Sequence, residues 1–218
     1  MNKEWSELNK TMQAQIKKKD TYKMGIDTLF NLRRQLMQTL VSFKEDFCRD
    51  DFNAIPFINA DGYHSKTIAY SIWHIFRIED IVAHTVITED EQVFFTGNYQ
   101  VRINSPIITT GNELVKQQIA DFSKQLNLEE LYSYIFEVRE STEKILERFS
   151  YDELKWKIPD ERKGYLKSLN VVNCDEKAIW LIDYWCSKDI RGLIQMPFSR
   201  HWIMHTEACL RIKNKMHS

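Results

Sequence analysis

The sequence predicts an all-α protein: a four-helix antiparallel bundle with accessory short helices and long connections. Three observations support this fold class. Gly occurs 6 times and Pro 4 times in 218 residues, well below the roughly 7% and 5% of average proteins, which disfavours a turn-rich β-sandwich or barrel. Long segments repeat apolar residues at steps of three and four, as amphipathic helices do. The connections vary in length and none divides the chain, so we expect a single domain over residues 1–218.

The first long helix is predicted over residues 21–47. Its apolar positions recur with helical spacing at Tyr22, Ile26, Leu29, Leu36, Leu40 and Phe43. A weaker repeat of the same spacing precedes it, and we interpret residues 1–20 as an N-terminal extension. Residues 50–66 collect Asp, Asn, Pro and Gly without a period, which is typical of a loop.

The second long helix, residues 67–88, is apolar on nearly every side. Such a helix is expected to be buried within a bundle. Ser65 or Thr67 could cap its N-terminus. Residues 89–110 then form a connection long enough to be a functional loop rather than a tight turn.

The third long helix is predicted over residues 128–149, where Asn127 supplies the N-cap. A short amphipathic helix over residues 112–126 precedes it. Residues 151–174 are irregular, with room for a short strand or hairpin.

The C-terminal part of the chain predicts two further helices. One starts at Asp175 and ends near Gly192 or at Pro197. Pro197 suits the first turn of the last helix, residues 197–216, because its missing N–H costs nothing there.

Three histidines are the strongest candidates for a functional site. His201 and His205 are four residues apart on the last predicted helix, so both imidazoles lie on one face, one turn apart. His74 lies in the most apolar helix, on the face shared by Tyr70 and Ile78. Three neutral imidazoles from two helices could hold a divalent metal and leave a coordination position open to water or substrate, the pattern of a catalytic site.

The same spacing has a structural alternative. Histidine pairs four residues apart occur by chance on helix surfaces, and a single histidine in an apolar helix is often a hydrogen-bonded core residue. A zinc-protease motif is excluded, because HWIMH at 201–205 lacks the Glu that follows the first His in HExxH. Peptide hydrolysis is therefore not expected, whereas a metal site and a packing role both stay open.

Three segments together resemble the DinB/YfiT-like superfamily, named for damage-inducible proteins. They are WHIFRIED around His74, NLEELYSYIFEVRESTEKILERFSYDELKW in the third long helix, and HWIMHTEACLRI near the C-terminus. The resemblance implies a four-helix bundle in which His74, His201 and His205 hold Zn, Ni or a similar metal. The chain departs from the family pattern at residues 206–208, where Thr, Glu and Ala replace the Arg, Gly and Gln of many members.

The resemblance also implies an activity. Characterised members include thiol-dependent transferases and isomerases, so we expect a metal-dependent enzyme with a divalent metal ion, a low-molecular-weight thiol and a small-molecule substrate. The metal would favour the thiolate of the thiol and so supply a nucleophile at neutral pH, whereas a hydrolase would activate water there. Residues 88–126 and 151–196 look longer than in compact members and could form a substrate lid.

The alternative function belongs to a different class. A non-catalytic metal-binding or stress-associated bundle would act through protein association, and its long apolar helix and many aromatic residues would suit a homodimer. A pocket open to solvent above the metal distinguishes the two hypotheses, because an enzyme needs one and a scaffold does not. A third hypothesis is a bundle that has lost its metal and keeps its histidines for packing.

Other polar residues have weaker claims on the site. Glu79 and Asp183 could orient a ligand histidine, but the rarity of buried carboxylates favours two solvent-facing charges. His84 lies about 80° around the helix from His74 and is not expected to share the metal. Asp80, four residues earlier, could hold His84 in place.

The remaining candidates receive structural interpretations. Glu207, two residues from His205, is expected to point away from the metal. The tryptophans near the histidines are expected to pack in the core and, secondarily, to wall an apolar pocket: Trp73, Trp180, Trp185 and Trp202. His64 and His217 have no expected role.

Charge and cysteine content limit the partners and the compartment. Lys+Arg 30 against Asp+Glu 31 gives a net charge of -1, so no basic field exists to attract nucleic acid. Cys48, Cys174, Cys186 and Cys209 form no CxxC pair, which predicts free thiols in a reducing cytosol. No apolar stretch of about 18 residues and no signal-peptide core occur, so we expect a cytoplasmic protein without a membrane partner.

Overall fold

The structure is a computed structural model that describes residues 2–216. It confirms the all-α class: within these residues there is no strand, and only an isolated bridge joins Lys157 and Asp189. The helices in chain order are α1 (Lys3–Gln15), α2 (Tyr22–Asp46), α3 (Arg49–Asn53), η1 (Gly62–His64), α4 (Ile68–Asp80), η2 (Ile81–Thr88), α5 (Val93–Thr96), α6 (Tyr99–Ile103), α7 (Gln117–Gln125), α8 (Leu128–Glu147), η3 (Glu153–Lys155), α9 (Glu161–Ser168), α10 (Glu176–Cys186), α11 (Ile190–Gln195) and α12 (Arg200–Met216).

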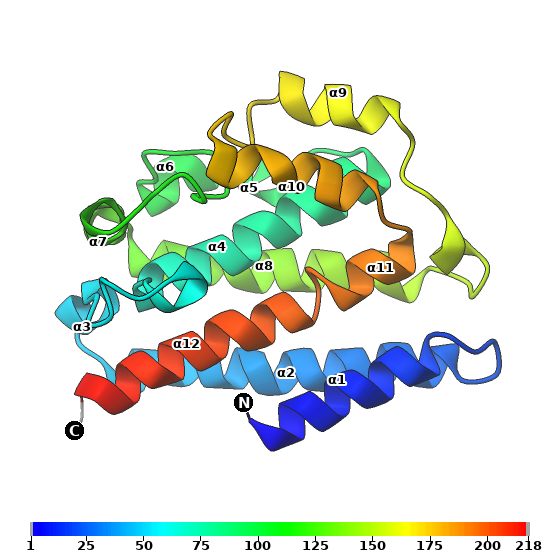
Figure 1. Cartoon of the computed structure of the whole chain (residues 1–218), viewed down its shortest axis with the longest axis horizontal. Coiled ribbons are helices and arrows are strands. Elements are labelled where there is room, and N and C mark those ends of the chain that lie inside the picture. The colour runs from blue at the N-terminus through cyan, green and yellow to red at the C-terminus, as the bar shows by residue number, and fades with distance from the viewer. Residues whose placement is uncertain (1, 217–218) are drawn as a thin grey trace.

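Four long helices form the central bundle. α12 packs on α2 and α4, and α8 packs on the same two helices from the other side, so the four contacts close a ring (Figure 1). α1 lies along α2, and its Trp5 and Met12 are buried in the core. The segment interpreted as an N-terminal extension is therefore part of the packed structure.

α4 is the most deeply buried helix, as its apolar sequence predicts. Each of its residues is buried. Thr67 rather than Ser65 caps it, because the Thr67 hydroxyl oxygen accepts a hydrogen bond from the Tyr70 backbone N–H at 3.0 Å. The π-helical segment η2 follows α4 directly. The helix predicted over residues 67–88 is therefore continuous, but its second part has π-helical hydrogen bonding.

The connections contain more helix than the sequence indicated. The predicted loops at 50–66 and 89–110 hold α3, η1, α5 and α6, and the segment 151–174 holds η3 and α9 instead of a strand or hairpin. Apolar side chains such as Val93 and Phe94 are buried there. The segments α3, η1, α5, α6 and η3 have only three to five residues. They are too short for helical periodicity to reveal them, which is why the sequence pattern did not predict these turns.

The predicted helix from Asp175 to Gly192 or Pro197 is wrong in one respect, because it is two helices. Asp175 caps α10 as expected. Asp189 then caps α11, and its carboxylate accepts a hydrogen bond from the Gly192 backbone N–H at 2.7 Å. Pro197 lies three residues before the first residue of α12, not in its first turn.

A buried polar network joins three helices of the bundle. Arg33 of α2 donates two hydrogen bonds to the Glu79 carboxylate of α4, at 2.7 and 2.9 Å, and both side chains are fully buried. The Trp202 indole N–H of α12 donates to the same carboxylate at 2.8 Å. The Arg33 guanidinium also lies over the Trp202 ring, 4.4 Å from its centroid. The network thus fixes α12 against α4 one residue from His201.

Replacing Glu79 by Gln should destabilise the fold strongly. The change removes the Glu79 charge and leaves Glu143, 3.0 Å from Arg33 Nε, as the remaining counter-ion of the buried guanidinium. Loss of one partner of a buried ion pair costs up to about 3–5 kcal/mol in proteins. We expect a shift of this size in urea unfolding followed by circular dichroism. The matched control is Asp183→Asn, which removes an exposed ion pair with Lys163 and should leave the midpoint unchanged. Equal midpoints for both variants would contradict the role given to this network.

Candidate metal centre

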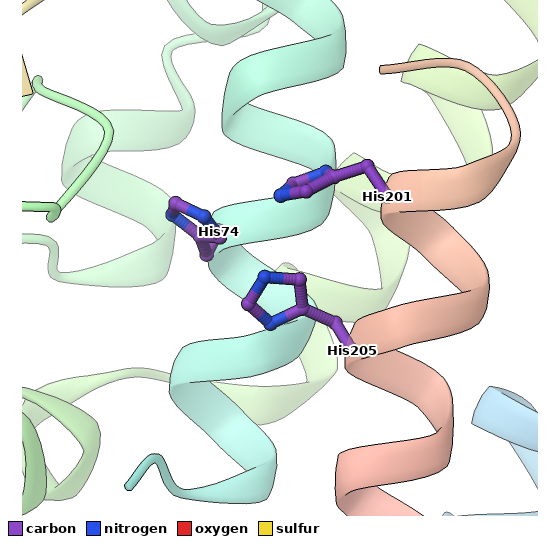
Figure 2. A group of neighbouring side chains, drawn as sticks. All are labelled: His74, His201 and His205. Carbon is purple, nitrogen blue, oxygen red and sulfur yellow. The ribbon is translucent and has the colours of Figure 1, made fainter. Parts of the chain in front are cut away.

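Three buried histidines converge between α4 and α12. His74 projects from α4, and His201 and His205 project from consecutive turns of α12 toward it (Figure 2). Their ring centroids are 4.6 to 5.0 Å apart. One potential ligand atom from each residue lies within 4.8 Å of the others. The tertiary structure therefore brings together the three residues that the sequence singled out.

His74 is held in one tautomer by a loop. Its Nδ1 lies 2.7 Å from the Thr110 carbonyl oxygen, and because a carbonyl only accepts, Nδ1 carries the proton. The lone pair is then on Nε2, the atom left for coordination. Ligand histidines in metalloproteins are commonly oriented by such a bond to a backbone carbonyl.

Gly111 allows this loop to approach α4 closely. Its φ is +76°, and a Cβ at this position would meet the Tyr70 ring at 3.0 Å. The Gly111 carbonyl accepts a hydrogen bond from the Tyr70 hydroxyl at 2.8 Å, and the Tyr70 ring stacks on His74 with centroids 5.4 Å apart. Sequence reasoning did not find Thr110 as the orienting group, because a backbone carbonyl leaves no residue-type signal.

His201 and His205 have buried nitrogen atoms that suit a metal. The Nδ1 atoms of both are buried without a hydrogen-bond partner in the described structure, an uncommon state for buried polar atoms. Zn–N bonds of about 2.0–2.1 Å place two nitrogens on one ion at most about 4.2 Å apart. Small side-chain rotations would bring one nitrogen of each ring within that nitrogen–nitrogen distance, because these atoms already lie within 4.8 Å of one another. The three histidines therefore fit a divalent cation.

Burial keeps the three imidazoles neutral, which is the form that binds metals. Desolvation lowers the pKa of His74 to about 4, against the opposing effect of the Thr110 hydrogen bond. Desolvation and the neighbouring histidines hold the pKa values of His201 and His205 well below their usual range. No proton therefore has to leave these rings before a cation binds at neutral pH.

A cleft opens over the histidines. Its volume is about 550 Å³, and His74 and His205 both line it. The rest of the wall comes from residues 58–66, from Tyr70, from residues 112–119 and from Lys177. The first of these segments includes η1, which packs on α12. Residues 58–66 belong to the segment 50–66, which the sequence pattern predicts to be a loop.

Lys66 is the most enclosed cation of this cleft. It is partly buried, and its ammonium lies over the Tyr70 ring, 4.8 Å from the centroid. Desolvation lowers the pKa of Lys66 to about 8. Most of the population is still protonated at pH 7, so the cleft contains a positive charge close to the histidines.

The carboxylates considered as partners of the histidines bind elsewhere. Glu79 pairs with Arg33 and Trp202, so the expectation that it faces solvent is wrong. Asp183 is exposed and pairs with Lys163, as a surface charge would. Neither carboxylate therefore orients one of the three histidines.

Glu207 also lies away from the histidine cluster. It accepts a hydrogen bond from the Asn2 backbone N–H. Its predicted orientation away from the metal is confirmed.

His84 belongs to a separate network. Its Nδ1 lies 2.7 Å from Asp90 Oδ1, and its Nε2 lies 3.0 Å from Ser141 Oγ. Asp80, the residue expected to hold it, is farther away at 4.0 Å. Ser141, His84 and Asp90 line no part of the cleft described above. We interpret the network as structural, because it links His84 of η2 to Ser141 of α8.

The other sequence candidates have structural roles. Trp73, Trp185 and Trp202 are buried in the core, as expected, whereas Trp180 is half exposed. His64 contacts the Arg211 guanidinium at the surface, and His217 lies outside the described residues. All four cysteines are free. None of the described helices has the length and hydropathy needed to cross a membrane.

Comparisons with known proteins leave the family unassigned. No family model matches the chain, and no curated protein matches it. The DinB/YfiT resemblance therefore stays a prediction. The structure supports two features that the resemblance implies: the protein is all-helical, and three buried histidines form a cluster.

Substituting any one of the three histidines by alanine should abolish stoichiometric metal binding. We expect about one Zn or Ni ion per untagged chain and none in His74→Ala, His201→Ala or His205→Ala, measured by elemental analysis after equilibrium dialysis. His84→Gln is the matched control, because it changes a buried histidine outside the cluster, and should keep the ion. Full occupancy in all three alanine variants would exclude this metal site.

The metal-free protein should lose stability in mild acid. His74 has a pKa of about 4 when folded against its ordinary 6.5, so the unfolded chain binds the extra proton between these values. The stabilising contribution is fully present above about pH 6.5 and is lost as pH falls to about 4. For His74 it is on the order of 3 kcal/mol.

Urea unfolding of chelator-treated protein at several pH values measures this effect. His74→Gln removes the titrating group and should show a shallower decline of unfolding free energy over the same range. If the substituted and unsubstituted proteins decline equally, the depressed pKa is not the source of the acid sensitivity.

Proposed function

We propose that this chain is a metal-dependent enzyme acting on a small molecule, with a divalent cation held by His74, His201 and His205. Zn and Ni are the preferred ions, because three neutral imidazoles without a carboxylate or thiolate suit both. The reaction type favoured is thiol-dependent transfer or isomerisation, with a hydrolase as the alternative within the same site.

One observation carries the proposal: the cleft of about 550 Å³ reaches two of the three histidines. A closed structural metal site has four protein ligands and no access, whereas a catalytic site has three and an open position. No fourth His, Cys, Asp or Glu joins the cluster within residues 2–216. An accessible three-ligand centre is also the feature that favours an enzyme over a scaffold acting through association.

The proposed reaction needs one contribution from the cation, the activation of a nucleophile. When bound, it would lower the pKa of a thiol or of water at its open position and so supply a nucleophile at neutral pH. The chain itself would supply orientation: the Thr110 carbonyl holds His74 by its Nδ1–H. Tyr63 lies beside His205, with ring centroids 6.0 Å apart.

Cobalt substitution tests this proposal directly. Metal-free protein is loaded with Co(II) and titrated with 2-mercaptoethanol, and we expect tetrahedral d–d absorption followed by a sulfur-to-cobalt charge-transfer band. His205→Ala is expected to show neither. Absence of stoichiometric cobalt binding would overturn the metal site, and bound cobalt without a thiol response would overturn the thiol-dependent reaction and leave hydrolysis to be assayed.

A further inference from the structure

We propose that the cleft over the histidines selects small molecules that carry a carboxylate or phosphate group, which Lys66 and Lys116 bind while the other end of the molecule meets the three histidines. This inference deepens the proposed function, because it names the class of substrate. The anion-binding part depends only on residues of the chain and can be tested with or without metal.

The charges that line the cleft are mainly positive. Three lysines contribute to its wall, Lys66, Lys116 and Lys177, against one carboxylate, Asp61, which is exposed. The protein as a whole has a net charge of -1, so this excess is local. A concave, partly enclosed site of one sign raises the local concentration of ions of the other sign.

Lys66 has no counter-ion of its own. Its ammonium lies over the Tyr70 ring, and within residues 2–216 it forms no ion pair. Enclosing an ammonium without an anion is unfavourable, and a bound carboxylate or phosphate would offset this cost. Glu113 forms no ion pair with Lys66 and does not line the cleft; one of its carboxylate oxygens accepts a hydrogen bond from the Thr109 hydroxyl.

Lys116 also lines the cleft and has an uncommon backbone conformation. Its φ is 50° and its ψ is -121°, a region that favours glycine. The turn is closed by a hydrogen bond from the Gln118 N–H to the Val115 carbonyl at 3.0 Å. The lysine is exposed at the cleft. Lys177 is less available, since it lies 3.6 Å from Asp175.

The spacing of Lys66 and His74 defines the shape of the ligand. Lys66 precedes α4, and its ammonium lies 4.8 Å from the centroid of the Tyr70 ring. The centroid of that ring lies 5.4 Å from the centroid of the His74 ring, so Tyr70 contacts both the ammonium and one of the three histidines. A cleft of about 550 Å³ accommodates a small molecule. The ligand therefore has two ends: a metal-binding group at the histidines and an anionic group several bonds away.

Binding of defined anions to the full-length protein tests the inference. Inorganic phosphate and glutarate are titrated by isothermal calorimetry into metal-free and metal-loaded protein, with glutaramide as the neutral analogue. We expect both anions or one of them to bind the metal-free protein, and glutaramide to bind at least tenfold more weakly. The anion that binds identifies whether a phosphate or a carboxylate is preferred.

Variants locate the binding site. Lys66→Met should weaken anion binding at least tenfold, Lys66→Arg should retain most of it, and Lys116→Met should weaken it less than Lys66→Met. Lys10→Met is the matched control, because Lys10 is an exposed lysine of α1, which contributes no residue to the cleft. Circular dichroism and the unfolding midpoint establish that each variant is folded.

The outcomes separate this inference from the proposed function. Anion binding that depends on Lys66 in protein that takes up no metal would uphold the anion site and overturn the metal-dependent enzyme. Metal binding together with no affinity for either anion, or with unchanged affinity in Lys66→Met, would overturn the anion site and leave the metal centre intact. Equal affinity for glutaramide and glutarate would also overturn it.

Discussion

The bidentate contact between Arg33 and Glu79 is the interaction on which the rest of the bundle depends. It is fully buried and joins α2 to α4, and the Trp202 indole adds α12 to the same carboxylate. Isolated buried charges are very unfavourable, so the helices must approach in the one arrangement that satisfies all of these groups. Glu79 lies five residues after His74, and Trp202 directly follows His201. The register that satisfies the ion pair is therefore also the register that brings the histidines together.

The histidine cluster has physical properties that follow from this burial. Enclosure by α4 and α12 keeps the imidazoles neutral, and the Thr110 carbonyl selects the tautomer of His74. The cluster nevertheless lies at the edge of the core, where the cleft reaches His74 and His205. Ligands that are preorganised by burial yet accessible from one side are what a metal centre with an exchangeable position requires.

Long amphipathic helices were predictable because their signal repeats many times. The apolar spacing over residues 21–47 and 128–149, together with the Asn127 cap, predicts α2 and α8 closely. The same reasoning failed where elements are short: α3, α5 and α6 have five residues or fewer. It also failed at Glu79, whose burial depends on an arginine 46 positions away in the chain, a distance at which local periodicity carries no information.

The sequence by itself determined the all-α class, the burial of α4 and the placement of His201 and His205 on one helix face, because helical spacing and residue chemistry are local properties. Only the tertiary structure decided how the site is completed. The Thr110 carbonyl, the Lys66 ammonium and the loops of the cleft reach the histidines through packing between segments distant in sequence. Backbone carbonyls and cavities have no residue type of their own, so their contribution exists only once the chain has folded around them.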